Sequence, residues 1–228
     1  MHKVKRNEPP EGLEELKCKF MKEYNENVNT TKEWNSLDHK LKKQIVYNLK
    51  EMYGGKCAYC ESNIGDNSYA HIDHFKPKSK FPLLIFEYNN MNYCCQICNT
   101  NKLEKYDSQM IDPSSEDPEK HIKYECEKAV SIDEKGYFMI ELLKLNDDER
   151  TMSRLELYRD IKEIINSLEI YCLLMDKMSD EDKHLAGALV ENLIKRVMEH
   201  LKHGAEYYTM CKHNFEDSIN KINKKLNN

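Results

Sequence analysis

Two pairs of cysteines with the same two-residue spacing are the feature of this sequence with the clearest chemistry. The pairs are Cys57-x-x-Cys60 and Cys95-x-x-Cys98. Four thiolates can surround one ion tetrahedrally at about 2.3 Å, and such a donor set selects Zn²⁺. A closed four-thiolate site leaves no position for water or substrate, so the predicted zinc is structural. The segment between the pairs has little apolar content, and we expect the metal to supply the folding free energy that it lacks.

The remaining cysteines leave one alternative ligand set open. Cys94 and Cys98 form a looser C-x-x-x-C, although the two-residue spacing of Cys95 and Cys98 is the better match to a zinc knuckle. A thiol oxidoreductase is the rival interpretation of a C-x-x-C pair. It is disfavoured because neither pair opens a helix after a strand in a βαβ unit. The isolated cysteines are predicted to be small buried side chains without a chemical role.

A second group of reactive side chains lies between the two pairs, in the run AHIDHFKPKS. His71, Asp73 and His74 stand at the end of a predicted strand. The Asp73 carboxylate is a hard oxygen ligand suited to Mg²⁺, and a neutral imidazole beside it can take a proton from water near neutral pH. Alone, such a run is more often a set of surface histidines or of extra zinc ligands. The positions of two asparagines instead favour a catalytic role for this run: Asn90 precedes the second cysteine pair, and Asn99 directly follows it.

This order of parts resembles the HNH, or ββα-metal, nucleases over about residues 54–108. In that family a first strand ends in Asp-His, an Asn opens the second strand, and a helix carries a final His or Asn. The resemblance implies that His74 activates the attacking water, while Asp73 and Asn99 hold one catalytic Mg²⁺ or Mn²⁺ ion. The chain departs from the literal motif by ending in Asn99, whose amide oxygen can replace imidazole as a ligand.

Further residues are predicted to support this catalytic group. The resemblance implies that Asn90 braces the loop that presents the histidine, and Asn89 is a close rival for that position. His71 is expected to orient Asp73 or to reach the metal through a water, in preference to binding it directly. Lysines of the same segment are candidates for contacts with the phosphate backbone or with the ligands: Lys76, Lys78, Lys80 and Lys102.

A narrower resemblance covers roughly residues 6–125. It is carried by the strings RNEPPEGL, GGKCAYCE, HIDHFKPKSKFP, YCCQICNTNK and IDPSSEDPEKHIKY. These look like the HNH subunit of Septu-type antiphage defence systems, the PtuB family. That family works beside an ABC- or SMC-like ATPase, PtuA. The resemblance therefore implies a role in antiviral defence and a PtuA-like ATPase as partner.

Apolar periodicity predicts the elements that must position these groups. Residues 1–12 are polar and Pro-rich, and we expect an extended lead-in there. An amphipathic helix is predicted over 13–24. A second is predicted over 30–53, opened by a Thr-x-x-Glu capping box and stopped by a pair of glycines. This second helix delivers the chain directly to Cys57.

The part of the chain after the cysteine pairs is predicted to be mostly helical. Residues 121–141 indicate a β-hairpin with a charged turn around 133–136. Three amphipathic helices follow over about 157–175, 179–197 and 208–226, the second behind a Ser-x-x-Asp cap. Packing among themselves is the simplest role for these helices.

These patterns together predict an α+β chain in which a small zinc-stapled ββα-metal core is embedded in mostly α-helical sequence. We expect an N-terminal helical segment at 1–52 and the HNH nuclease core at 53–112. The remainder, 113–228, is predicted to be a β-hairpin with a C-terminal helical region that docks the partner.

Charge is distributed unevenly along the chain. The 228 residues carry a net charge of −5, whereas the window from Lys40 to Lys105 holds ten lysines against six acidic residues, a net of +4. Affinity for nucleic acid comes largely from phosphate neutralisation, so the acidic total argues against a protein that coats nucleic acid nonspecifically. A mildly basic centre fits a catalytic module that needs help to hold its substrate.

Neither secretion nor membrane insertion is indicated by the sequence. The longest apolar runs, such as Leu83 to Phe86, are far too short to cross a bilayer, and no apolar stretch follows the charged N-terminus. Nine cysteines without a secretion signal point to a reducing compartment. We expect a cytoplasmic protein without a membrane partner.

The sequence thus predicts a metal-dependent HNH endonuclease that hydrolyses phosphodiester bonds of nucleic acid, with DNA favoured over RNA. The alternative from another class is a catalytically inactive, zinc-stapled module that binds nucleic acid or protein. The intact set of Asp73, His74, Asn90 and Asn99 favours the enzyme, because a degenerate copy has no chemical reason to keep all four.

Overall fold

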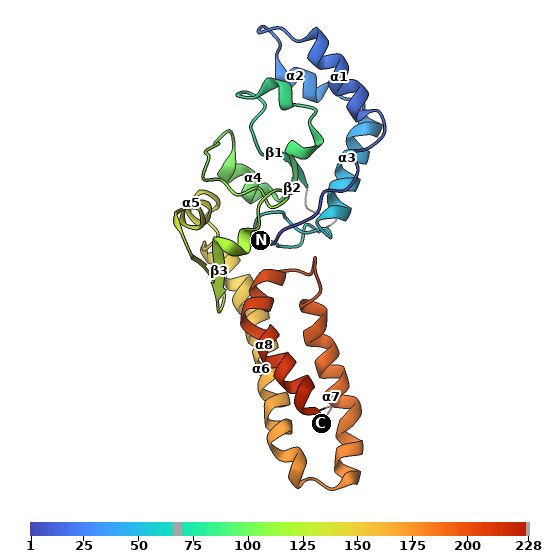
Figure 1. Cartoon of the computed structure of the whole chain (residues 1–228), viewed down its shortest axis with the longest axis vertical. Helices are drawn as coiled ribbons and strands as arrows, with labels where there is room; N and C mark the ends of the chain where they lie inside the picture. Colours follow the sequence, from blue (N-terminus) through green and yellow to red (C-terminus); the bar gives the residue numbers. More distant parts are fainter. Residues whose placement is uncertain (66–69, 227–228) are drawn as a thin grey trace.

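A head and a long helical arm make up the molecule, as Figure 1 shows. The computed structural model describes residues 1–65 and 70–226. The head contains the N-terminal helices and the first two strands, and the arm consists of the last three helices. The N-terminus lies close to the junction of the two parts.

The first ten residues contain no helix or strand, as predicted, yet several of their side chains are buried. Met1 and Val4 belong to the hydrophobic core, and the Val4 N–H donates to the Pro113 carbonyl at 2.9 Å. The lead-in is therefore part of the packed head and joins it to residues that follow the second cysteine pair.

Three helices form the N-terminal part of the head, where the sequence predicts two. α1 spans Leu13–Glu23, close to the predicted bounds. The predicted second helix is divided into α2, Thr30–Asn35, and α3, His39–Met52. α3 ends just before the first cysteine pair, as expected.

Local capping explains why the predicted second helix is divided. The Asp38 carboxylate accepts a hydrogen bond from the Leu41 N–H at 3.0 Å, and this N-cap begins a new helix. The predicted capping box at Thr30 is also wrong. The N-cap of α2 is Asn29, whose side-chain oxygen accepts from the Lys32 N–H at 3.0 Å.

A β-hairpin followed by a helix forms the centre of the head. β1, His71–His74, pairs antiparallel with β2, Met91–Cys94, so that Asp73 faces Asn92. α4, Gln96–Lys102, follows β2 after one residue. This strand, loop, strand and helix form the small ββα unit that the sequence predicts. The predicted fold class, an α+β chain that is mostly helical, is confirmed.

A second hairpin lies where one is predicted, but its turn and second strand were predicted wrongly. β3, Ile122–Glu125, pairs with β4, Lys128–Ser131. The segment YFMIEL, predicted as a strand, belongs to α5, Glu134–Leu143. The Asp133 carboxylate accepts from the Gly136 N–H at 2.9 Å and caps this helix. Residues 133–136, predicted as the turn of the hairpin, therefore form the N-cap and the start of α5.

The arm contains three helices, as predicted. They are α6, Asp148–Leu174, α7, Asp180–His200, and α8, Tyr208–Leu226. α8 runs from the junction along α6 (Figure 1). In the part of the chain that the structure describes, the connections contain four short 3-10 turns: η1 (Pro82–Leu84), η2 (Tyr88–Asn90), η3 (Pro118–Lys120) and η4 (Met175–Lys177). Within the described residues, no helix combines the length and apolar character needed to cross a membrane.

Buried polar contacts join the arm to the head. The Glu61 carboxylate, next to the first cysteine pair, accepts from the Thr209 hydroxyl at 2.5 Å and from the His2 Nδ1 at 2.6 Å. The Tyr124 N–H of β3 donates to His213 Nδ1 of α8 at 3.0 Å. Of these contacts, the one between Thr209 and Glu61 crosses the predicted boundary between 112 and 113. The three-segment division remains a prediction, and the last segment does not pack as a separate body.

Gly136 provides a test of the corrected assignment of α5. A Cβ atom at this position would lie 1.9 Å from the His121 carbonyl oxygen. We expect Gly136→Ala to lower the free energy of unfolding by about 2 kcal/mol or more, because two backbone segments would have to move apart. Tyr137→Ala, at the neighbouring position with 62% exposure, should change it by less than about 0.5 kcal/mol. Denaturant unfolding measures both values, and wild-type stability of Gly136→Ala would contradict this packing.

Candidate active site and metal centre

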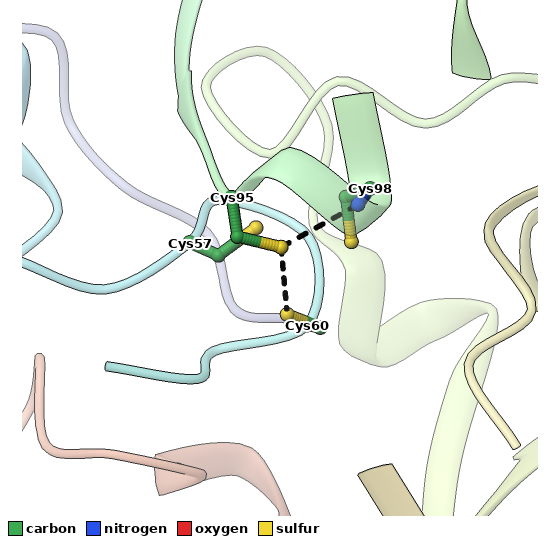
Figure 2. Close-up of side chains that lie close together, drawn as sticks. All are labelled: Cys57, Cys60, Cys95 and Cys98. Carbon is green, nitrogen blue, oxygen red and sulfur yellow. Dashed lines mark hydrogen bonds between the residues drawn. The ribbon is translucent and has the colours of Figure 1, made fainter. Parts of the chain in front are cut away.

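The two cysteine pairs come together from the turn after α3 and the start of α4. Cys57 and Cys60 lie in a tight turn in which the Glu61 N–H donates to the Cys57 carbonyl at 3.0 Å. Cys95 is the N-cap of α4, and Cys98 lies in its first turn. Figure 2 shows the four side chains converging from these two segments.

The four sulfur atoms have the spacing of a tetrahedral metal site. They all lie within 4.8 Å of one another, and Cys60 Sγ is 3.8 Å from Cys95 Sγ. Zn–S bonds of about 2.3 Å in a tetrahedron separate the sulfurs by about 3.8 Å. Burial raises the pKa of the Cys57 thiol, so a bound cation is needed to keep such a buried cluster ionised. The donor set fits a structural metal and could hold zinc.

Cys94 and Arg150 lie next to this cluster. The Cys94 thiol donates to the Cys95 carbonyl at 3.3 Å, and Cys94 is not a member of the four-sulfur group. Arg150, in the first turn of α6, donates from Nη1 to Cys98 Sγ at 3.4 Å. Its guanidinium is buried, and the Asp147 carboxylate lies 3.2 Å from Nε. A cation beside metal-bound thiolates offsets part of their negative charge, so the arm contributes to the metal centre.

The ββα unit brings four of the predicted functional residues to one cavity of about 240 Å³. Asp73 and His74 come from the end of β1, and Asn99 comes from α4, directly after Cys98. The full lining consists of Ile72, Asp73, His74, Pro77, Lys78, Asn99, Leu103 and Glu104. Two carboxylates (Asp73 and Glu104), one amide, one imidazole and one ammonium group therefore border the same space.

Both oxygens of the Asp73 carboxylate are held by residues of the metal-binding segments. The hydroxyl of Tyr59, inside the first cysteine pair, donates to Oδ2 at 2.6 Å. Lys102 Nζ, at the end of α4, donates to Oδ1 at 2.8 Å and to the His74 carbonyl at 2.9 Å. Lys102 has 0% exposure, so its ammonium cannot reach a phosphate of the substrate, and that one of its two predicted roles is wrong. Its ammonium supports Asp73, the other role considered.

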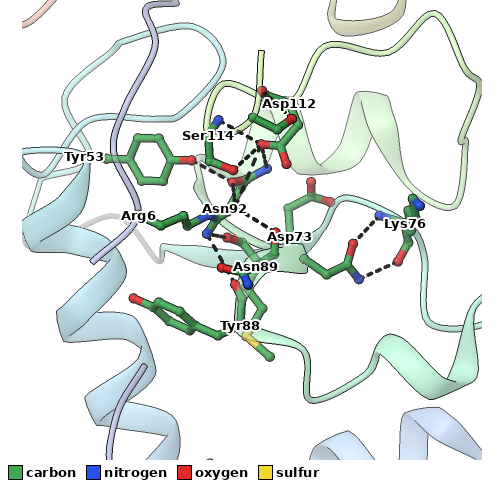
Figure 3. Close-up of polar contacts among 12 residues, drawn as sticks. Arg6, Tyr53, Asp73, Lys76, Tyr88, Asn89, Asn92, Asp112 and Ser114 are labelled. Atoms are coloured by element: carbon green, nitrogen blue, oxygen red, sulfur yellow. Dashed lines mark hydrogen bonds and ion pairs between the residues drawn. The ribbon is translucent and has the colours of Figure 1, made fainter. Parts of the chain in front are cut away.

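A buried network behind Asp73 joins β2 to the N-terminal segment. Asn92 Oδ1 accepts from the Tyr53 hydroxyl at 2.6 Å and from Arg6 Nη2 at 2.9 Å, as Figure 3 shows. The Asn92 amide donates to the Tyr59 hydroxyl at 3.3 Å, which in turn donates to Asp73. Arg6 also donates to carbonyls of η2 and of the start of β2. The network fixes the position of Asp73 from the side away from the cavity.

His74 has only 6% exposure, and its ring is fixed by two contacts. Its Nε2–H donates to the Ile85 carbonyl at 2.9 Å, and the Trp34 ring packs against it with a centroid distance of 4.6 Å. Because a carbonyl can only accept, Nε2 carries the proton and Nδ1 keeps its lone pair. Burial lowers the pKa of His74 to about 4, so the imidazole is neutral at neutral pH.

The two neighbouring asparagines of η2 differ in what their side chains contact. Asn90 Oδ1 accepts from the Lys76 N–H at 2.8 Å, and its amide donates to the Lys76 carbonyl at 2.9 Å. Asn89 is exposed, and its backbone carbonyl accepts from Arg6 Nη2 at 3.1 Å. Of the two, it is the Asn90 side chain that holds the loop after His74.

Two other predicted residues lie away from the cavity lining. His71 is half-buried and pairs with Cys94 in the hairpin. The Lys76 ammonium lies 5.7 Å from the ring centroid of Tyr106. Among the four lysines considered for phosphate contacts, Lys78 is the one that lines the cavity.

Four residues that shape the site are not among those predicted from the sequence. They are Arg6, Tyr59, Asn92 and Arg150. Asn92 could have been predicted, because an amide within a short strand of mostly apolar residues needs buried hydrogen-bond partners. Arg150 carried none, since it lies 52 positions from Cys98 and no local pattern connects them.

Comparison with known families supports the assignment of the central unit. Residues 57–105 match the sequence model of the HNH endonuclease family. The match begins at Cys57 and includes Asp73, His74 and Asn99. The ββα unit is therefore an HNH domain, as the resemblance implied.

Two curated proteins are similar to the chain over a longer stretch. Septu protein PtuB of Bacillus mycoides (strain KBAB4) is 26% identical, with 59% of this chain and 59% of that protein covered. Septu protein PtuB of Bacillus thuringiensis is 31% identical, with 64% of this chain and 55% of that protein covered. The chain thus spans less than two thirds of the length of these relatives. The predicted resemblance to PtuB proteins is confirmed.

The metal centre predicts one tightly bound zinc per chain. Cys60→Ser should release it and lower the melting temperature strongly, because the segment between the cysteine pairs depends on the metal. Cys126→Ser, at an exposed cysteine outside the cluster, should keep both zinc and stability. Elemental analysis and thermal unfolding measure these properties. Folded wild-type protein without zinc would contradict the assignment.

Proposed function

We propose that the chain is a metal-dependent HNH endonuclease that hydrolyses phosphodiester bonds of nucleic acid, with DNA favoured over RNA. One observation carries this proposal: Asp73, His74 and Asn99 line a single cavity of the HNH domain. They supply two oxygen ligands for a cation and one neutral imidazole beside them. This is the set of groups that metal-assisted phosphodiester hydrolysis requires.

We propose that Asp73 and Asn99 hold one Mg²⁺ or Mn²⁺ ion, while the four cysteines hold Zn²⁺. Carboxylate and amide oxygens are ligands that hard divalent cations prefer, and thiolates are not. A carboxylate offers about four lone-pair directions, and Tyr59 and Lys102 occupy two of them, which leaves Asp73 able to bind a cation. When bound, the ion would neutralise charge on the scissile phosphate and stabilise the leaving oxygen.

His74 is the proposed general base. Nδ1 is the ring nitrogen left to accept a proton from the attacking water, because Nε2 donates to Ile85. The contacts of the ring with Trp34 and Ile85 fix its orientation before substrate arrives. Asn90 is proposed to position the loop behind this histidine, and Lys78 to contact a phosphate oxygen of the substrate.

We propose further that the chain serves in antiphage defence beside an ABC- or SMC-like ATPase of the PtuA type. The similarity to proteins named Septu protein PtuB supports this role. Electrostatics also favours a partner: a central window of net +4 allows few phosphate contacts, and each contributes only about one unit to the salt dependence of binding. The proposed docking segment is 113–228, whose three-helix arm extends away from the head (Figure 1).

Asn99→Ala and His74→Ala test the catalytic assignment. Each should lower cleavage of plasmid DNA in Mg²⁺ or Mn²⁺ by about 100-fold or more while zinc content stays at the wild-type level. His74→Ala should also lower the melting temperature modestly, because it leaves a cavity beside Trp34. Thr100→Ala, exposed at the next position of α4, is the matched control and should cleave normally.

The same cleavage experiments distinguish an active nuclease from a catalytically inactive, zinc-stapled binding module. If Asn99→Ala cleaves at the wild-type rate, Asn99 is not a ligand of the catalytic ion. If the wild-type chain binds nucleic acid but does not cleave DNA or RNA with either metal, alone or with the ATPase, the inactive binding module is the better account.

The partner proposal predicts that the chain alone cleaves poorly at physiological salt and gains activity with the ATPase. Truncating the arm would not test this cleanly, because it would remove Arg150 and Thr209 from their contacts with the head. A better variant places lysine at both Leu185 and Leu189 of α7, which are 82% and 63% exposed. Co-purification with the ATPase should weaken for this double variant.

Tyr47→Lys, at a 62% exposed aromatic residue of α3 outside the proposed docking segment, is the control for that experiment and should retain the ATPase. Equal capture of the arm variant, the control and the wild-type chain would place the docking surface away from this face of α7. Efficient cleavage by the chain alone at physiological salt would remove the need for a partner.

A further inference from the structure

A groove of about 460 Å³ is lined mainly by residues of α1, of α2 and of the start of α3. Figure 1 shows α1 and α2 at the end of the head opposite the arm. The groove is separate from the cavity that holds the candidate catalytic residues. Its lining consists of Gly12, Glu15, Leu16, Lys19, Phe20, Glu23, Glu33, Ser36, Leu37, Asp38, Leu41 and Phe86.

The groove has an apolar floor. Phe20, Leu37 and Phe86 form its base, and Leu16 and Leu41 are half-buried at its sides. The rings of Phe20 and Phe86 pack edge to face with a centroid distance of 5.3 Å. Such a floor can accept an apolar side chain of a ligand that enters the groove.

The rim of the groove is acidic. Glu15 and Glu23 are exposed around it, Glu33 is half-buried there, and the carboxylate of Asp38 caps α3 at the same edge. Lys19 is the lining residue that opposes this charge. The nearby ion pairs made by Lys17 use Glu14 and Glu87, which are not part of the groove. Glu15 and Glu23 are accessible to solvent, and Glu33 is partly accessible.

A short series of ring contacts connects the floor to the candidate base. Phe86 packs against Trp34 with a centroid distance of 6.3 Å, and Trp34 packs against His74 at 4.6 Å. Ile85, the residue before Phe86, accepts the hydrogen bond from His74 Nε2. A ligand that displaces Phe86 would therefore disturb both contacts that hold the imidazole.

We propose that this groove docks a basic, amphipathic segment of a partner protein, and that docking acts on His74 through Phe86 and Trp34. Lysine or arginine side chains of the segment would pair with the rim glutamates, and an apolar side chain would cover Phe20 and Phe86. The effect on His74 rests on the proposed nuclease function, whereas docking itself does not. Nucleic acid is an unsuitable occupant, because carboxylates on the rim repel phosphates.

Trp34 makes docking measurable, because it is the single tryptophan of the chain. The probe is the peptide acetyl-KKLLKKL-amide, which lacks tryptophan, and its matched control is acetyl-EELLEEL-amide. We expect the basic peptide to change Trp34 fluorescence saturably and to bind at least about tenfold more tightly than the acidic one. Affinity should fall as salt is raised. Absence of saturable binding, or equal binding of both peptides, would overturn the docking proposal.

Charge-neutralising variants locate the binding to the groove. The rim variant carries Glu15→Gln, Glu23→Gln and Glu33→Gln, and the control variant carries Glu11→Gln, Glu26→Gln and Glu51→Gln at exposed positions outside the groove. Both change the net charge equally. The rim variant should lose about tenfold in affinity for the basic peptide, and the control should lose little. Equal losses would indicate nonspecific attraction and overturn the assignment of the site.

The proposed effect of docking on His74 is tested by measuring the rate of nucleic-acid cleavage in the presence of each peptide. We expect the basic peptide to change the cleavage rate of the wild-type chain and of the control variant at concentrations that do not affect the rim variant. Bound peptide with an unchanged rate would overturn the coupling. If the chain shows no nuclease activity but still binds the basic peptide at the rim, the proposed function fails while the docking site stands.

Discussion

The convergence of four cysteine sulfurs within 4.8 Å is the constraint on which the candidate active site depends. Tyr59 lies inside the first cysteine pair and Lys102 lies at the end of the helix that carries the second, and each holds one oxygen of Asp73. Asn99 directly follows the last cysteine. A metal bound at the cysteines would thus fix both supports of Asp73 and the backbone of Asn99, the two proposed ligands of the catalytic ion. The cysteine cluster and the candidate catalytic cavity are separate sites, and these short connections link them.

Contacts from distant parts of the chain converge on the same region. Arg6 reaches Asn92 behind the carboxylate, Arg150 of the arm donates to Cys98, and Thr209 of α8 binds Glu61 beside the first cysteine pair. Each is a buried polar or charged contact, and loss of one partner would leave the other unsatisfied. Head, N-terminal segment and arm therefore meet around the cysteine cluster.

Much of this arrangement was predictable from sequence, because it depends on local spacing. The cysteine pairs, the Asp73-His74 pair and the long amphipathic helices follow from residue types at fixed intervals. Predictions failed where a single capping side chain outweighed periodicity, as Asp38 does in dividing the predicted second helix and Asp133 does in beginning α5. Lys102 and Arg150 show a second reason why sequence-based prediction fails. A buried ammonium and a guanidinium at a thiolate are set by tertiary contacts that no short pattern of residues records.

The dependence of the proposed catalytic ligands, Asp73 and Asn99, on the metal at the cysteines can be tested by Mn²⁺ binding. Electron paramagnetic resonance follows this binding as zinc is removed stepwise with a chelator. This account predicts that Mn²⁺ affinity falls in proportion to zinc lost and returns when zinc is restored, because Tyr59, Lys102 and Asn99 lose their positions without it. Zinc-loaded Asn99→Ala should bind Mn²⁺ weakly throughout. Undiminished Mn²⁺ binding by the zinc-free wild-type chain would contradict the claim that the cysteine cluster holds the catalytic site together.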